Sequence, residues 1–328
     1  MRGLDLKDKK LLVALSQNAR ASQAQLGKAV GLSKSAIPGR IERLQKKNVI
    51  RSFATVVNFD PLGYKMYTVF LKVDTVDGFF DYFCKHPFGI WSCRLLGGWD
   101  FHIEVIAKNI DHFNSILMEM LAFFGDSLLG YETHMALEVY KVEHLPGVFV
   151  SGVDVEKLPL SSRKWKENVT LDIVGRKLLH ALNVDASLPL HMLAKQCGCT
   201  LDVVHYRMKT LFKQGVILQY IPFVSLQALG YEEYYCNVSL RHLTFEKAAT
   251  LKQFLISSGH VKFAFRGASR LEVLFLLAVR TTLELDTFLK EFKSLFSEHI
   301  LSLDAMLVTE QGPLGWFPKG LVDDHSQK

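Results

Sequence analysis

The sequence predicts an α+β protein made of two winged helix-turn-helix domains, each followed by a ferredoxin-like βαββαβ domain. Three observations support this fold class. Residues 21–50 have the pattern of two short helices, a tight turn and the start of a strand. The same pattern returns later in the chain. After each copy, β-branched and aromatic runs alternate with amphipathic stretches in the order strand, helix, strand, strand, helix, strand.

The first helix-turn-helix is indicated by its helix caps. Ser22 and Gln25 have the spacing of a capping box, and Gly31 is placed to end that helix in the left-handed conformation. Ser33 is predicted to cap a second helix that ends at Lys47. One face of this second helix is apolar, with Ile37, Ile41 and Leu44 at helical spacing. A basic helix between a glycine-containing turn and a strand is typical of a major-groove reader.

Positive charge is concentrated on this motif. The chain of 328 residues has a net charge of +6, and residues 1–53 contain 12 Lys and Arg against 3 Asp and Glu. Residues 168–220 contain 6 against 3, so the remaining residues are net negative. A basic face can simply be solvated, but its coincidence with the motif favours contact with the phosphates of double-stranded DNA.

Composition also predicts the compartment. No apolar run reaches the length of a membrane span, and the first residues have no apolar signal region. The five cysteines are scattered and odd in number, which favours reduced thiols over a disulfide framework. The sequence therefore predicts a cytoplasmic protein without a membrane partner.

An internal repeat relates the two motifs. Residues 4–64 align without a gap with residues 171–231, at an offset of 167. Matched apolar positions, such as Leu44 and Leu211, keep the helical period, so both copies should fold alike. The chain is interpreted as a tandem duplication.

These patterns predict the domain boundaries. The domains are a first winged helix-turn-helix (1–53), a first ferredoxin-like domain (54–142), a linker (143–167), a second, less basic and degenerate winged helix-turn-helix (168–222), a second ferredoxin-like domain (223–310) and an irregular tail (311–328). Trp165 is expected to anchor part of the linker. A helix is expected at 110–124, with strands at 101–107 and 128–142.

The assembly is predicted from the ferredoxin-like layout. Helices cover one face of each antiparallel sheet and leave the other face exposed. Because a large apolar face rarely stays in water, we expect the two sheets to pack on each other within one chain, as an intrachain pseudo-dimer. Pairing between chains, which would give a homo-oligomer, is the competing outcome.

The order and spacing of these motifs resemble the leucine-responsive regulator (Lrp/AsnC) family of prokaryotic transcription factors. The matching positions are Leu4-Asp5, Asp8, Leu11-Leu12, Leu15, Ala19-Arg20, Leu26, Val30-Gly31-Leu32-Ser33, Arg40-Ile41, Leu44, Val49-Ile50 and Leu62-Gly63-Tyr64. The likeness covers almost the whole chain, twice. It implies a helix-turn-helix joined to a ferredoxin-like effector-binding (RAM) domain. It also implies a sequence-specific DNA-binding transcriptional regulator, with no catalytic activity and no cofactor.

The resemblance implies that the helix matching Ser33 to Lys47 enters the major groove. The residues assigned to DNA in the first motif are Ser22, Gln23, Ser33, Lys34, Ser35, Pro38, Gly39, Arg40, Arg43, Lys46, Lys47 and Arg51. Serines and a lysine at a helix N-terminus suit phosphates and base edges, and the later cations suit the backbone. Pro38 and Gly39 disfavour helix, so the recognition helix is expected to be locally irregular.

The second motif departs further from this pattern. The residues assigned to DNA there are His205, Tyr206, Arg207 and Lys209. Asp202 stands where Ser35 stands in the first motif. With its smaller positive charge, the second motif is expected either to bind DNA more weakly or to serve mainly as a structural partner.

In this family, effectors that are typically amino acids bind near a Gly-x-x-Asp turn between the two middle strands. The matching residues, assigned here to an amino-acid effector, are Gly97, Gly98, Trp99 and Asp100. The glycines allow backbone N–H groups to face a carboxylate, and Asp100 can accept an ammonium. A plain turn capped by Asp100 is the alternative. The second copy has Arg270 in place of Asp100, so it should not bind the same ligand in the same way.

Two other functions stay open. Siroheme decarboxylases resemble the same family, can occur as two fused halves, and place histidines and arginines around a tetrapyrrole. Their motif should fall near residues 91–94, where no histidine occurs. A scaffold that has lost DNA binding fits the second motif better than the first.

A metal site is disfavoured. The four side chains considered for it are His191, Cys197, Cys199 and His205. In the repeat both cysteines align with core positions, and a one-residue gap is poor zinc spacing. Buried free thiols are the better interpretation.

Overall fold

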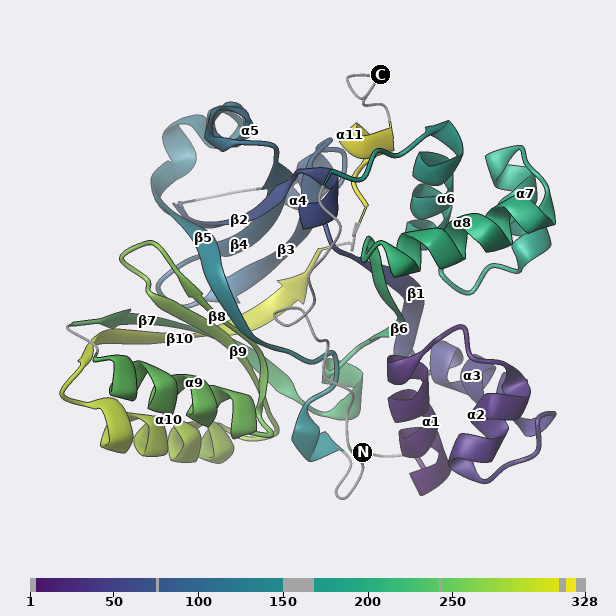
Figure 1. The fold of residues 1–328 in the computed structure, drawn as a ribbon. Helices are drawn as coiled ribbons and strands as arrows, with labels where there is room; N and C mark the ends of the chain where they lie inside the picture. The colour runs from purple at the N-terminus through teal and green to yellow at the C-terminus, as the bar shows by residue number, and fades with distance from the viewer. Residues whose placement is uncertain (1–3, 75–76, 150–167, 242–243, 313–316, 323–328) are drawn as a thin grey trace.

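The computed structural model describes residues 4–74, 77–149, 168–241, 244–312 and 317–322. Two groups of helices lie on one side of the molecule, and strands with packed helices form the other side (Figure 1). The described elements confirm the predicted α+β fold class.

Each helical group is a helix-turn-helix head. The first head consists of α1 (Leu6–Gln17), α2 (Gln23–Val30) and α3 (Ala36–Lys46), and the second of α6 (Ile173–Val184), α7 (Leu190–Cys197) and α8 (Leu201–Lys213). Leu11 and Leu44 of the first head are fully buried. Their matched positions in the second head, Leu178 and Leu211, are buried too. The repeated apolar positions therefore form the two cores.

A strand follows each head, and the two strands pair with each other. Strand β1 (Ile50–Val57) runs antiparallel to β6 (Ile217–Val224), as an isolated two-stranded ribbon. Both strands run across the predicted domain boundaries after residues 53 and 222, because their pairing continues along the ribbon. The strand expected as the wing of each head therefore joins the two heads (Figure 1).

Matched hydrogen bonds fix each head on the ribbon. The Ala19 N–H donates to the Tyr220 carbonyl over 2.8 Å, and the Ala186 N–H donates to the Phe53 carbonyl over 2.9 Å. Each bond runs from the loop after a head's first helix to the strand of the other head. The heads are thus held to each other as well as to their own strands.

Both ferredoxin-like units have the predicted βαββαβ order. The first contains β2 (Lys65–Val73), α4 (Phe79–Phe83), β3 (Gly89–Leu96), β4 (Phe101–Ala107), α5 (Ile110–Phe124) and β5 (Leu128–Val142). The second contains β7 (Glu232–Leu240), α9 (Phe245–Ser257), β8 (Val261–Gly267), β9 (Val273–Val279), α10 (Thr282–Phe296) and β10 (Ile300–Gln311). Short 3-10 helices occur at Asp60–Leu62, Gly125–Ser127, Gly147–Phe149 and Gln227–Leu229. Phe113 of α5 and Phe292 of α10 are buried where these helices cover the sheets.

The two sheets close into one barrel within the chain. The strand order is β10-β3-β4-β2-β5-β8-β9-β7. Strand β3 pairs with β10 and β5 pairs with β8, so the last strand of each unit joins the second strand of the other. The inner faces enclose a core that includes Phe70, Cys93, Leu274 and Met306. The open sheet faces therefore bury each other, and closure pairs both edges of each sheet.

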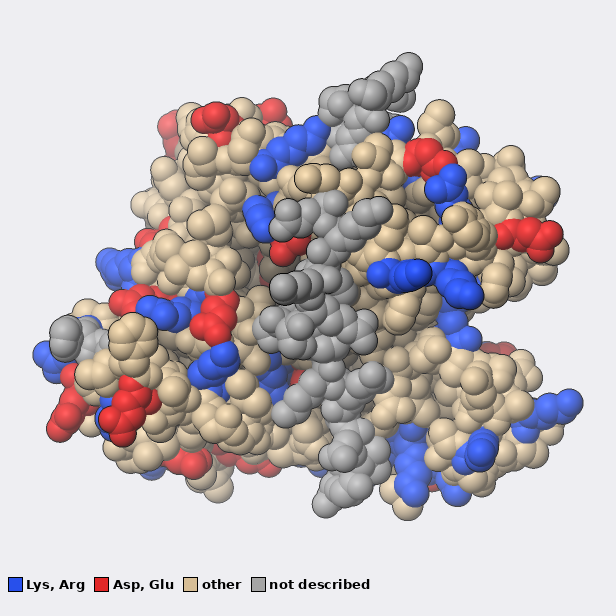
Figure 2. Space-filling view, viewed as in Figure 1, with Lys and Arg blue, Asp and Glu red and all other residues tan. Residues whose placement is uncertain are grey.

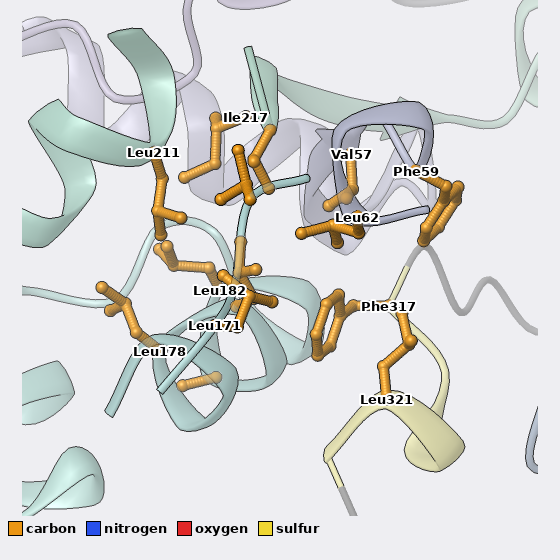
Figure 3. Close-up of a cluster of buried hydrophobic side chains, with 14 of the residues drawn as sticks. Val57, Phe59, Leu62, Leu171, Leu178, Leu182, Leu211, Ile217, Phe317 and Leu321 are labelled. Carbon is orange, nitrogen blue, oxygen red and sulfur yellow. The ribbon is translucent and has the colours of Figure 1, made fainter. Parts of the chain in front are cut away.

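The end of the chain packs on the second head. A short helix, α11 (Lys319–Val322), follows Phe317, and the Phe317 and Leu321 side chains are buried. They lie near Leu171 of the second head and Phe59 of the segment after β1 (Figure 3). Where an irregular tail was expected, β10 thus continues to residue 311 and a helix turn follows. The reason is that two apolar side chains four residues apart bury on one core.

Only part of the predicted linker is described. Phe149, at the end of a 3-10 helix, is buried with the core of the first head. Residues 150–167, including Trp165, lie outside the described residues.

Candidate nucleic-acid interface and effector turn

The first head has the caps that the sequence predicts. The Ser22 side chain accepts from the Gln25 N–H over 3.2 Å, and the Gln25 side chain accepts from the Ser22 N–H over 2.8 Å. Gly31 ends α2 with φ +67°, a conformation that disfavours other residues. A side chain on Gly27 would come within 2.7 Å of the Leu32 carbonyl oxygen. The turn between α2 and α3 is therefore tight.

Helix α3 is regular, which corrects the expectation of a local irregularity. It begins at Ala36, so Pro38 is its third residue. In the first turn the proline removes no helical hydrogen bond, because N–H groups there have no intrahelical acceptor. The predicted cap at Ser33 is also wrong: the capping position is Ser35, which makes no side-chain cap hydrogen bond. The two hydroxyl oxygens instead lie 3.1 Å apart.

The start of α3 is presented to solvent. The five residues of this stretch that were assigned to DNA are Ser33, Lys34, Ser35, Pro38 and Gly39, and all of them are exposed. A Cβ added at Gly39 would meet no atom within 4 Å. Nothing in the described chain therefore covers the end of the helix that would approach a DNA groove, and polar hydroxyls and a lysine lie there together.

The two arginines of α3 are ion-paired to α1. Arg40 Nη1 lies 2.7 Å from Asp5 Oδ2 and 2.7 Å from Asp8 Oδ1. Arg43 Nη2 lies 2.5 Å from Asp8 Oδ2, and the Asp8 side chain is fully buried. The hydrogen bond from Arg40 lowers the pKa of Asp5. The hydrogen bonds to Asp5 and Asp8 in turn raise the pKa of Arg40. These arginines fix α3 on α1, and the lysines remain as the more available phosphate ligands.

Sequence reasoning missed this acidic anchor, although the repeat carried a signal for it. Asp5 aligns with Asp172 and Arg40 with Arg207. In the second head Arg207 also pairs with Asp172. The same pair in both copies, an aspartate before the first helix and an arginine in the third, could have indicated a structural contact.

Several exposed cations of the first head lie on α3 or within a few residues of it. Lys34, Lys46 and Lys47 are exposed, and Lys46 lies 2.6 Å from Glu42 one turn earlier. Arg51 stacks over the Phe223 ring of β6, with its guanidinium 5.7 Å from the ring centroid. Lys and Arg side chains are visible on the faces of both heads in Figure 2. Ser22 and Gln23 lie at the start of α2, on the same head.

Helix α8 offers a different surface. His205, Tyr206 and Lys209 are exposed, and Arg207 is half-buried beside Asp172. Large apolar side chains are also exposed on this helix at Leu201, Val203, Tyr206 and Phe212. Thr200 caps the helix through its side chain. The second head thus has the geometry of a reading head with fewer cations and more apolar surface.

The predicted effector turn connects β3 and β4 at the barrel wall. Gly97 has φ +152° and faces Met306 of β10, so a larger residue would collide with it. Asp100 Oδ1 lies 3.2 Å from Lys72 Nζ, and its Oδ2 accepts from the Val73 N–H over 2.8 Å. Trp99 lies beside Phe70, 6.2 Å between ring centroids. Because both oxygens of Asp100 already have donors, a ligand ammonium must compete with Lys72.

The thiols considered for a metal site lie in or beside a core. Cys197 is buried in the core of the second head, and Cys199 packs against the same core. Burial raises the pKa of Cys197 to about 11. In the described residues no three His, Cys, Asp or Glu side chains are grouped as metal ligands would be.

Comparison with known proteins identifies the family to which the chain belongs. Residues 4–45 match the model of the AsnC-type helix-turn-helix domain. The HTH-type transcriptional regulator FL11 of Pyrococcus furiosus is 30% identical over 145 residues, which cover 43% of this chain and 95% of that protein. The chain belongs to the AsnC-type helix-turn-helix family of transcriptional regulators.

Other members of this family align over a similar length. The transcriptional regulator AzlB of Bacillus subtilis is 26% identical over 145 residues, 42% of this chain and 91% of that protein. The regulator AldR of Mycolicibacterium smegmatis is 29% identical over 143 residues, 42% of this chain and 83% of that protein. Each alignment leaves more than half of this chain unmatched.

One solved structure shares the fold over nearly the whole chain. The crystal structure of the siroheme decarboxylase NirDL covers 96% of both chains with a TM-score of 0.65 and 11% identity. At that identity the likeness concerns the fold alone.

Among the described helices, none has both the length and the apolar character needed to cross a membrane.

Proposed function

We propose that this chain is a cytoplasmic, non-catalytic transcriptional regulator that binds specific double-stranded DNA, and that its first head supplies most of the affinity. The observation that carries the proposal is the exposed start of α3, with Lys34, Ser33 and Ser35 beside each other on a head of the AsnC type. Exposed hydroxyls, a lysine and the positive end of a helix suit phosphates and base edges.

The difference between the heads supports the second part of the proposal. The first head has three exposed lysines on or next to α3, whereas the surface of α8 is rich in apolar side chains. Non-specific DNA affinity comes mainly from cations that neutralise phosphates. The second head is proposed as the weaker reader, positioned by the β1–β6 ribbon.

The test compares matched losses of charge. DNA fragments enriched by the protein from a genomic library provide the ligand, and binding is measured by fluorescence anisotropy at several salt concentrations. The double variant Lys46→Ala/Lys47→Ala removes two cations from the first head, and Lys209→Ala/Lys213→Ala removes two from the second. The first pair should lower the salt slope by about one per lost phosphate contact, and the second by less. If the two double variants lower the salt slope equally, or if the second-head variant lowers it more, the assignment is contradicted.

An amino acid is proposed as the effector, bound at the Gly97 to Asp100 turn. The turn has the glycines and the carboxylate that such a ligand requires, and it lies where the first unit meets β10 of the second. A ligand there would contact both halves of the barrel.

A second candidate function is decarboxylation of a siroheme-type tetrapyrrole. The whole-chain likeness of fold to NirDL favours it. His102 is buried and pairs across the strands with Cys93, within residues 91–94 where the decarboxylase motif is expected. Absorbance of the purified protein and turnover of siroheme test this alternative: a colourless protein that leaves siroheme intact excludes it.

A further inference from the structure

A cavity of about 540 Å³ lies between the β1–β6 ribbon and the barrel. Val56 of β1 and Ile221 of β6 line it on the ribbon side, and Phe265 and Leu276 line it on the barrel side. Its volume lies within the range of small-molecule sites, roughly 300–1,000 Å³. The cavity is separate from the Gly97 to Asp100 turn, none of whose residues lines it.

An ion pair occupies one side of the cavity. Lys262 Nζ of β8 lies 2.6 Å from Glu233 Oε1 of β7, and both side chains are only 9% exposed. Gln311 Nε2 donates to Glu233 Oε2 over 2.7 Å. Each oxygen of this carboxylate therefore has a donor, and the Lys262 ammonium has an anion. The pair is satisfied without a ligand.

Glu104 of β4 also lines this cavity, but unlike Glu233 it is not paired with a donor or cation in the described residues. It lies beside Trp91 of β3, its partner across the strand pair. In the described parts of the chain, no side chain or backbone N–H donates a hydrogen bond to Glu104 and no cation pairs with it. Lys65, the other lysine of the lining, is held by Asp60 at 2.9 Å. Burial raises the pKa of Glu104 to about 7. Glu104 is half-buried, and a ligand that supplies a positive charge would stabilise its ionised carboxylate.

The charge balance of the lining favours a cation. Among the described residues, three carboxylates, two ammonium groups and one histidine line the space, and they are Asp60, Glu104, Glu233, Lys65, Lys262 and His144. Burial, together with Lys262, lowers the pKa of His144 to about 3, so the imidazole is neutral at pH 7. One carboxylate is thus in excess. The remaining walls are mainly aliphatic and aromatic side chains, which favour an apolar ligand body.

We propose that this cavity binds an organic monocation, a primary ammonium on an apolar aromatic body, with the ammonium at Glu104 and the body against Trp91, Tyr235 and the ribbon. A ring system suits these aromatic walls, and an ammonium over a Trp or Tyr face gains a cation–π contribution. A carboxylate ligand is disfavoured, because it would have to break the Lys262–Glu233 pair and lie beside Glu104. The inference does not depend on DNA binding.

The test uses two probes that share one ring system. Tryptamine carries an ammonium and indole-3-propionate carries a carboxylate on a similar chain. Isothermal titration calorimetry of the full chain at pH 8 should show binding of tryptamine and at least tenfold weaker binding of indole-3-propionate, about 1.4 kcal/mol or more. Glu104→Gln keeps the shape and removes the charge, so it should weaken tryptamine binding at least tenfold.

Two further variants make the test decisive. Ala136→Phe adds a ring to the cavity lining and should abolish tryptamine binding by filling the space. Glu138→Gln removes an exposed carboxylate that pairs with Lys252, and should leave binding unchanged. The inference is overturned if tryptamine does not bind at millimolar concentration, if the acid binds as well as the amine, or if Glu104→Gln keeps full affinity. A protein that binds tryptamine but no DNA would overturn the proposed function and leave this inference standing.

Discussion

Asp8 of α1 is fully buried, and Arg43 of the recognition helix reaches it with Nη2 2.5 Å from Oδ2. Arg40 reaches the other oxygen of the same carboxylate at 2.7 Å. The first and third helices of the first head are therefore joined by one carboxylate shared between two guanidinium groups. Residues that look like a phosphate-binding row in the sequence have an internal structural role.

We predict that Asp8→Asn destabilises the protein by about 2 kcal/mol, because two guanidinium groups lose their buried anion. Arg207→Ala, which removes the half-exposed pair with Asp172 in the second head, should cost only about 0–1 kcal/mol. Urea denaturation followed by circular dichroism measures both. If the two variants have equal midpoints, the buried pair contributes no more than an exposed one.

Glu104 should make stability depend on pH. The pKa of Glu104 is raised from 4.5 to about 7 by burial in the folded state, so the folded chain binds its proton more tightly than the unfolded chain. Stability should therefore fall as pH rises from about 4.5 to 7 and stay level above, by about 3 kcal/mol at 1.36 kcal/mol per pKa unit. Cys93 of β3 and Tyr235 of β7 interact electrostatically with Glu104. The other titratable or charged residues that line the same cavity are Asp60, Lys65, His144, Glu233 and Lys262.

Comparison of the wild type with Glu104→Gln isolates this contribution. Burial lowers the pKa of His102 to about 3 and that of His134 to about 4, so these histidines destabilise both proteins as pH falls below about 6.5. Their contribution cancels in the difference between the two proteins. Unfolding midpoints at pH 5 and pH 8 should show the variant gaining relative stability at pH 8. A constant difference would mean that Glu104 titrates normally.

Much of the fold follows from local pattern. Helix α5 and strands β4 and β5 have the bounds expected from the sequence, because apolar period and flanking turn residues specify them locally. The left-handed Gly31, with φ +67°, was likewise indicated by residue type. The internal repeat extended the fold prediction to the second half of the chain, where the positive charge is too low to indicate a DNA-binding motif by itself.

Other features depend on contacts that no local pattern encodes. The pairing of β1 with β6 joins residues more than 150 positions apart, and either strand alone resembles a wing. Burial of Phe317 depends on a surface of the second head that exists only after folding. The cavity at Glu104 has one signal in the sequence: His102 and Glu104 alternate with buried apolar residues on β4, which places both polar side chains on one face of the strand.

At the effector turn, Lys72 occupies the carboxylate of Asp100 that a ligand ammonium would need. If an amino acid binds with its ammonium at Asp100, then Lys72→Met should tighten binding, because Lys72 no longer occupies Asp100 Oδ1. Asp100→Ala should abolish it. Calorimetry against the common amino acids, with Asp304→Ala as a control next to Gly98, measures all three. Weaker binding in Lys72→Met would indicate that the lysine contacts the ligand carboxylate instead.

Arg20 of the first head binds the second head through a contact that has no counterpart in the repeat. Its Nη1 donates to the Ala186 carbonyl over 2.6 Å and to the Leu188 carbonyl over 2.8 Å, both in the second head. The position that matches Arg20 in the repeat is Ser187, which cannot reach back in the same way. Hydrogen bonds from a charged donor are worth about 1.5–3 kcal/mol each, so Arg20→Ala should loosen the spacing between the heads.

The consequence for DNA depends on whether both heads touch it. When two heads bind one duplex, the fixed geometry raises the effective concentration of the second head, and loosening lowers it. Arg20→Ala should then weaken binding to a duplex long enough for both heads by several-fold, with little change on a duplex that holds only one. Arg20→Lys, which keeps the charge and can reach one carbonyl, should restore part of the loss. Equal effects on the two duplexes would show that the second head adds no DNA contact and serves as a structural partner of the first.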